Sequence, residues 1–273
     1  MAQRSAPIGA FDSGVGGLSV LRTIRARLPG EDLIYFADQA HVPYGPRGLA
    51  EVRRLSEVIV RFLMDQGAKL IVIPCNTASA AALHSLRDQY PGFPFVGMEP
   101  AVKPAAERTA SGVVGVLATP TTFEGELYSS VVERFGQGVT ILQDACPGLV
   151  AEIEAGRANG PEAHRILKAA LEPMLAKGLD TVVLGCTHYA FAFAAIRDIV
   201  GDGVRLIDPA PAIARRVEQL LDEGAIRSPQ TGGGTTRYLT SGDPAAMKAR
   251  LNELLGESAE VESIRWREQE ITV

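Results

Sequence analysis

The chain has 273 residues, 46% of them hydrophobic, and a formal net charge of −5 at pH 7, so it can bury the core of one large domain or two small ones. The mild negative charge gives no support for nucleic-acid binding, no apolar run reaches the roughly 18 residues of a membrane span, and the first residues lack the apolar segment of a signal peptide. Three cysteines, an odd number without a signal peptide, favour reduced thiols over disulfides, and we therefore expect a cytoplasmic globular protein.

Short aliphatic runs alternate with longer amphipathic stretches along the chain. Two of these stretches, 49–67 and 160–178, have helical spacing and end in glycine, a common helix stop. The expected strands are 7–11, 32–37, 69–74, 94–98, 112–118, 139–143, 180–185 and 203–208. Continuous apolar strands between helices are typical of a parallel sheet that is covered on both faces, so the sequence predicts an α/β fold.

The chain also repeats itself at nearly constant spacing. Four landmarks recur in the same order: "IGAFDS" with "VGVLAT", "YFAD" with "ILQD", Cys75 with Cys186, and "GMEPA" with "LIDPA". Because the repeat is long and occurs only twice, it indicates two similar α/β domains related by duplication rather than a solenoid. The matched turns predict one domain from 1–97 plus 208–273 and another from 98–207. Strand ends of both domains would then meet at a cleft between them, where open α/β sheets bind ligands.

Each half of the repeat places a cysteine where an aliphatic strand ends and a helix begins. "LIVIPCNTASA" contains Cys75 and "TVVLGCTHYA" contains Cys186. A lone cysteine is more often a small buried side chain, as we expect for Cys146, but two at equivalent positions favour a functional pair. Two opposed thiols suit the inversion of a stereocentre, which needs a base on one face of the carbon and an acid on the other. Hydrolysis by a nucleophilic Cys186 with His188 would leave Cys75 without a role.

The remaining motifs do not match the common signatures of cofactor or metal sites. "DSGVGGLSV" (12–20) follows a strand, but it lacks the third glycine of a dinucleotide fingerprint and the lysine of a P-loop. Its glycines favour close approach of backbone amides to a carboxylate or thiolate at a helix start. Cys186 and His188 lack the paired spacing of a zinc site. No cofactor and no metal are expected; pyridoxal phosphate is not excluded by motif, but the thiol pair makes it unnecessary.

Four ordered motifs, "GAFDSGVGGLSVL", "FADQAHVPYGPRG", "IPCNTASA" and "LGCTHYA", resemble the glutamate racemases, within the aspartate/glutamate racemase superfamily. The resemblance spans roughly residues 8–210, and the last sixty residues carry little signature. It implies a cofactor-independent isomerase that interconverts L- and D-glutamate, supplies D-glutamate for peptidoglycan and forms a homodimer. The alternatives are an aspartate racemase of the same fold and a non-catalytic small-molecule binding protein.

The resemblance also implies roles for single residues. The implied catalytic set is Cys75, Cys186, Asp12, Glu154 and His188. The implied substrate-binding set is Asp12, Ser13, Tyr44, Gly45, Asn76, Thr77, Thr187 and His188. Glu152 competes with Glu154 for the acidic position, and Ala190 replaces a proline that is usual in the family, which bears on local rigidity.

Overall fold

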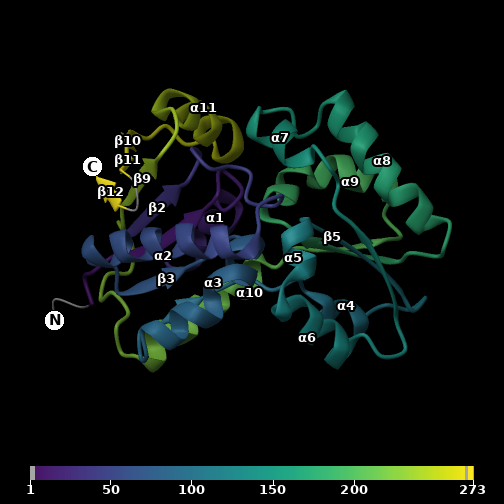
Figure 1. The fold of residues 1–273 in the computed structure, drawn as a ribbon, viewed down its shortest axis with the longest axis horizontal. Coiled ribbons are helices and arrows are strands. Elements are labelled where there is room, and N and C mark those ends of the chain that lie inside the picture. The colour runs from purple at the N-terminus through teal and green to yellow at the C-terminus, as the bar shows by residue number, and fades with distance from the viewer. Residues whose placement is uncertain (1–3, 268–269, 273) are drawn as a thin grey trace.

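Two parallel sheets, one in each lobe of the molecule, organise the chain (Figure 1). The computed structural model describes residues 4–267 and 270–272. The first described strand, β1, and the last, β12, lie in the same lobe (Figure 1). Within the described ranges, no helix combines the length and the apolar character needed to cross a bilayer.

The first sheet has six strands, which run in the order β10-β9-β2-β1-β3-β4 and are all parallel. Their bounds are β1 (Ile8–Asp12), β2 (Leu33–Ala37), β3 (Leu70–Val72), β4 (Phe95–Val96), β9 (Thr236–Thr240) and β10 (Val261–Ser263). Its helices are α1 (Leu18–Arg27), α2 (Leu49–Asp65), α3 (Asn76–Gln89), α10 (Ala210–Glu223) and α11 (Pro244–Leu255). Alternate strand residues enter two separate cores, one beneath α1, α10 and α11 and the other beneath α2 and α3. Burial on both faces explains the continuous apolar runs.

The second sheet has four parallel strands in the order β6-β5-β7-β8. Its strands are β5 (Val113–Ala118), β6 (Thr140–Asp144), β7 (Thr181–Gly185) and β8 (Arg205–Ile207). Its helices are α4 (Val102–Ala106), α5 (Pro120–Glu124), α6 (Glu126–Phe135), α7 (Leu149–Glu154), α8 (Pro161–Leu175), the 3₁₀ helix η1 (Thr187–Ala192) and α9 (Phe193–Val200). One face of this sheet packs against α7, α8 and α9 and the other against α4 and α6.

The strand orders confirm the predicted duplication. The segment β2-β1-β3-β4 of the first sheet repeats as β6-β5-β7-β8 in the second. All eight expected strands form, and the two expected helices are α2 and α8. Gly67 and Gly178, which follow these helices, have φ angles of +83° and +85°, a backbone conformation that glycine adopts without steric cost.

The C-terminal segment adds elements that the sequence analysis did not predict. Strands β9 and β10 extend the first sheet beyond β2, and β11 (Arg265–Arg267) pairs with β12 (Glu270–Thr272) in an antiparallel hairpin. The strands of each sheet fall within the domain boundaries expected from the sequence, 1–97 plus 208–273 and 98–207. These boundaries themselves stay a prediction.

Candidate active site

The carboxyl ends of strands from both sheets meet around one small cavity. Ten predicted residues line it: Asp12, Ser13, Tyr44, Gly45, Cys75, Asn76, Thr77, Cys186, Thr187 and His188. The structure adds three lining residues that the sequence analysis missed: Pro43, Thr119 and Val150. Thr119 could have been found from the repeat, because it aligns with Ser13 in the pairing of "VGVLAT" with "IGAFDS". Glu154 does not line the cavity but lies directly behind His188.

Cys75 caps the amino end of α3, immediately after the first sheet. Its Sγ accepts a hydrogen bond from the amide of Ala78 at 3.4 Å. Burial raises the pKa of the Cys75 thiol well above its usual value, and the nearby Asp12 carboxylate raises it further, against the amides of Ala78 and Ser13. The expected preference of a helix start for the thiolate is therefore outweighed at this position.

Asp12 ends β1 and is fully buried. Its carboxylate accepts hydrogen bonds from the hydroxyl of Ser13 at 3.0 Å and from the hydroxyl of Thr187, in the other lobe, at 2.9 Å. Burial raises the pKa of Asp12, although His188 and these hydroxyls act in the opposite direction. A buried carboxylate beside Cys75 can hold or release a proton in the cavity.

Cys186 follows β7 and precedes η1, which forms although Ala190 stands in place of a proline. The Sγ of Cys186 lies 3.9 Å from Nδ1 of His188, and Nε2 of His188 lies 2.6 Å from Oε1 of Glu154. Burial alone would lower the pKa of His188, but hydrogen bonds with Cys186 and Glu154 raise that pKa well above 6.5. Burial alone would raise the pKa of Glu154, but His188 and neighbouring donors hold it below 4.5. The Cys186 thiol, the His188 imidazole and the Glu154 carboxylate thus contact one another in series.

The glycine-rich loop of the first lobe holds the Glu154 carboxylate, which contacts His188. The amide of Val15 donates to Oε1 of Glu154 at 2.8 Å, as expected for glycines that admit a carboxylate to backbone amides. A methyl group at Gly14 would overlap Glu154, and one at Gly16 would overlap His188. Glu152, the competing residue, instead forms an exposed ion pair with Arg157. The geometry therefore favours Glu154 for the acidic position.

Polar groups line the remaining walls of the cavity. Among the described residues, neither the amide nitrogen nor the amide oxygen of the buried Asn76 side chain has a hydrogen-bond partner. The hydroxyls of Thr77, Thr119 and Thr122 form a chain with 2.8 Å between successive oxygens. Buried amides are normally paired, so Asn76 is available to a bound molecule. Over the part of the chain that the structure describes, no three His, Cys, Asp or Glu side chains are grouped to hold a metal ion.

The whole chain is similar to known proteins in both sequence and fold. A model of the Asp/Glu/hydantoin racemase family matches residues 17–217. The glutamate racemase of Roseiflexus sp. is 51% identical over 243 residues, which cover 89% of each chain. A glutamate racemase isoform from Bacillus anthracis matches with a TM-score of 0.86 and 30% identity, covering 95% of this chain and 97% of that one. The Francisella tularensis glutamate racemase, solved with D-glutamate, matches with a TM-score of 0.82 and 29% identity, covering 95% and 97%.

Proposed function

The chain belongs to the Asp/Glu/hydantoin racemase family, and we propose that it is an isomerase that interconverts L- and D-glutamate. One observation carries the proposal: two cysteines at equivalent positions of two duplicated lobes line the same cavity. The choice of glutamate is supported by relatives of similar length that are named glutamate racemases, and by the D-glutamate bound to the Francisella protein.

The proposed reaction is proton transfer through the α-carbon. The thiolate of one cysteine removes the α-proton from one face, and the thiol of the other cysteine delivers a proton to the opposite face. One proton leaves the carbon and one arrives, so the substrate is neither oxidised nor reduced. The reverse reaction exchanges the roles of Cys75 and Cys186. Neither a metal nor pyridoxal phosphate takes part in this scheme.

We assign different proton-handling partners to the two thiols. Asp12 serves Cys75, because both side chains line the same cavity and Asp12 is the buried carboxylate beside that thiol. His188 serves Cys186, because its Nδ1 faces the sulfur while Glu154 holds the other ring nitrogen. A proton on His188 stabilises negative charge on the Cys186 sulfur, as a neighbouring cation does in other reactive cysteine sites.

The α-carbon is a much weaker acid than a thiol, so the cavity must stabilise the charge that develops on the substrate. Preorganised donors in a buried site do this most effectively. Asn76 fits this role, since its buried amide has no partner in the described structure. We assign Ser13, Thr77 and Thr187 to the same substrate-binding set, together with Tyr44 and Gly45, whose loop forms a cavity wall.

We further propose the cellular context that follows from this activity. D-glutamate made by the enzyme would supply peptidoglycan synthesis, and thereby cell-wall formation and cell shape. The enzyme would act in the cytoplasm as a homodimer. Size-exclusion chromatography with light scattering tests the dimer, which would elute at about twice the chain mass of 29.0 kDa.

The decisive experiment follows the α-proton. The wild-type protein is incubated in deuterium oxide with L- or D-glutamate, and in parallel with L- or D-aspartate. Chiral chromatography measures racemisation and mass spectrometry measures deuterium at the α-carbon. We expect both for glutamate. Racemisation of aspartate alone would indicate an aspartate racemase, and no exchange with any of the four would indicate a binding protein.

Serine variants test the two-thiol assignment. Cys75→Ser and Cys186→Ser should each reduce racemisation by at least about 100-fold, because a serine hydroxyl is a far weaker acid than a thiol at the same position. The matched control is Cys146→Ala, which changes a buried cysteine that does not line the cavity. Wild-type racemisation by either serine variant would refute the assignment.

A further inference from the structure

The cavity wall formed by Pro43, Tyr44 and Gly45 is anchored from outside the cavity. The hydroxyl of the buried Tyr44 donates a hydrogen bond to Oδ2 of Asp38 at 2.6 Å. Asp38 follows β2 and is itself fully buried. The position of Tyr44 therefore depends on what holds Asp38.

Asp38 collects donors from three separate parts of the chain. Besides Tyr44, Nδ1 of His41 lies 3.0 Å from both carboxylate oxygens. The hydroxyl of Ser241, just beyond β9, donates to Oδ1 at 2.7 Å, and the indole Nε1 of Trp266, in β11, donates to the same oxygen at 2.8 Å. A buried carboxylate needs such donors, since each one lost leaves charge uncompensated.

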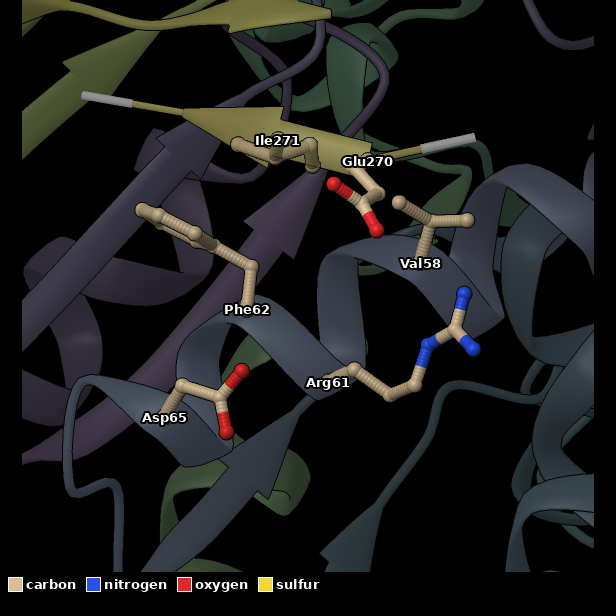
Figure 2. A pocket seen from close by; sticks show the side chains of 6 residues that line it. All are labelled: Val58, Arg61, Phe62, Asp65, Glu270 and Ile271. Carbon is tan, nitrogen blue, oxygen red and sulfur yellow. The ribbon is translucent and has the colours of Figure 1, made fainter. Parts of the chain in front are cut away.

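Packing fixes the hairpin that supplies Trp266. Ile271 of β12 lies over α2 with Phe62 beneath it, while Val58, Arg61 and Asp65 line the same hollow (Figure 2). Both Trp266 and Ile271 pack against the apolar core beneath α2. The Trp266 ring also meets the His41 ring edge to face, with centroids 4.9 Å apart. The hairpin is thus seated on a helix and reaches Asp38 from a fixed position.

We propose that the C-terminal hairpin β11–β12, acting through Trp266 and Asp38, is a positioning brace for the Tyr44 wall of the substrate cavity. It makes no contact with the cavity itself, because neither Trp266 nor Asp38 is among the residues that line it. Its contribution is to hold Pro43, Tyr44 and Gly45 in the arrangement that admits substrate. This inference deepens the proposed function and rests on it for the kinetic part of its test.

Trp266→Phe removes the indole donor and keeps an aromatic ring on α2 and His41. The matched control is Tyr238→Phe in β9 of the same C-terminal segment, which removes the hydroxyl that donates to Glu257 at 2.6 Å. For Trp266→Phe we expect the KM for glutamate to rise about three- to tenfold with kcat within about twofold, because the lost hydrogen bond holds the cavity wall and not the substrate itself. For Tyr238→Phe we expect both constants to stay within about twofold of wild type.

Hydrogen exchange supplies a readout that needs no substrate. In Trp266→Phe the amides of residues 40–47 should exchange about three- to tenfold faster than in wild type, and in Tyr238→Phe they should not. Unaltered exchange in 40–47, or equal acceleration in the control, would overturn the brace. If the wild type turns over no acidic amino acid, the proposed function fails, while the exchange result still decides the brace.

Discussion

The two thiol sites have the same backbone setting and different chemistry. Cys75 follows β3 and Cys186 follows β7, and these strands occupy equivalent places in the two sheets. Cys75, however, caps an α-helix beside a carboxylate, whereas Cys186 precedes a 3₁₀ helix and faces an imidazole. Duplication has preserved the position of the thiol and not the ionisable group beside it.

The partners of the two thiols do not stand at equivalent positions. In the repeat, Asp12 aligns with Ala118, and His188 aligns with Thr77. Each lobe also supports the partner that belongs to the other: Thr187 donates to Asp12, and the amide of Val15 donates to Glu154. Each thiol therefore shares a lobe with its own partner, while one donor to each partner comes from the opposite lobe.

The largest test of this comparison replaces one proton-handling partner at a time. Asp12→Asn and His188→Asn should each lower kcat by about 100-fold or more, because each removes one member of an acid–base pair. The enantiomers have equal free energy, so kcat/KM must fall equally in both directions for either variant. The asymmetry is instead visible in the primary isotope effects on α-deuterated L- and D-glutamate.

The two variants should raise the isotope effect for different enantiomers. A weakened base makes proton abstraction limiting only for the enantiomer that it deprotonates, so the isotope effect rises for that enantiomer alone. Asp12→Asn should raise it for one enantiomer and His188→Asn for the other. The same enantiomer responding to both variants would mean that the two groups serve one thiol.

A second test disturbs the contact between the lobes. Gly16→Ala inserts a methyl group where His188 lies, and should reduce kcat by about 10- to 100-fold through displacement of the imidazole. Gly48→Ala is the control, because a methyl group there meets nothing within 4 Å and the φ angle is −68°. Initial rates at saturating glutamate measure both. Equal activity of the two variants would show that the close approach of the glycine loop to His188 is unimportant.

The smallest test separates Glu154 from Glu152 by pH. Glu154 has a lowered pKa, so its contribution to stability is present above about pH 4.5 and is lost as pH falls through its folded pKa. His188 has a raised pKa, so its contribution is present below about pH 6.5 and is lost as pH rises through its folded pKa. Urea unfolding measures the free energy of unfolding of wild type and of Glu154→Gln. Between about pH 4.5 and about pH 6.5 the variant should be less stable by about 2 kcal/mol, and at lower or higher pH the difference should be smaller.

Glu152→Gln is the matched variant for that test. Its ion pair with Arg157 is exposed to solvent, so its unfolding curve should follow the wild type across the same pH range. Its racemisation rate should also stay within about twofold of wild type. A pH-dependent loss of stability in Glu152→Gln rather than in Glu154→Gln would reverse the assignment of the acidic position.

Local sequence patterns were enough for much of the molecule. The eight strands, the duplication and the pairing of Cys75 with Cys186 all follow from short runs and their spacing. The anchoring of Asp38 could not be predicted, because two of its donors, Ser241 and Trp266, lie more than 200 residues away in sequence. Strands β9 and β10 were missed because they have no counterpart in the repeat, from which the other strands of the first sheet could be recognised.

The late position of β9 in the chain has a consequence for synthesis. The second sheet is complete once residue 207 has left the ribosome, whereas β2 waits for residues 236–240 before its outer edge is paired. The edge strand β6 of the second sheet, "TILQD", is partly exposed and polar, but β2, "LIYFA", is apolar throughout and fully buried. An unpaired apolar strand is a template for association with other chains. The outer edge of β2 therefore stays an unpaired apolar edge until residues 236–240 have been added, whereas every strand of the other lobe is already present.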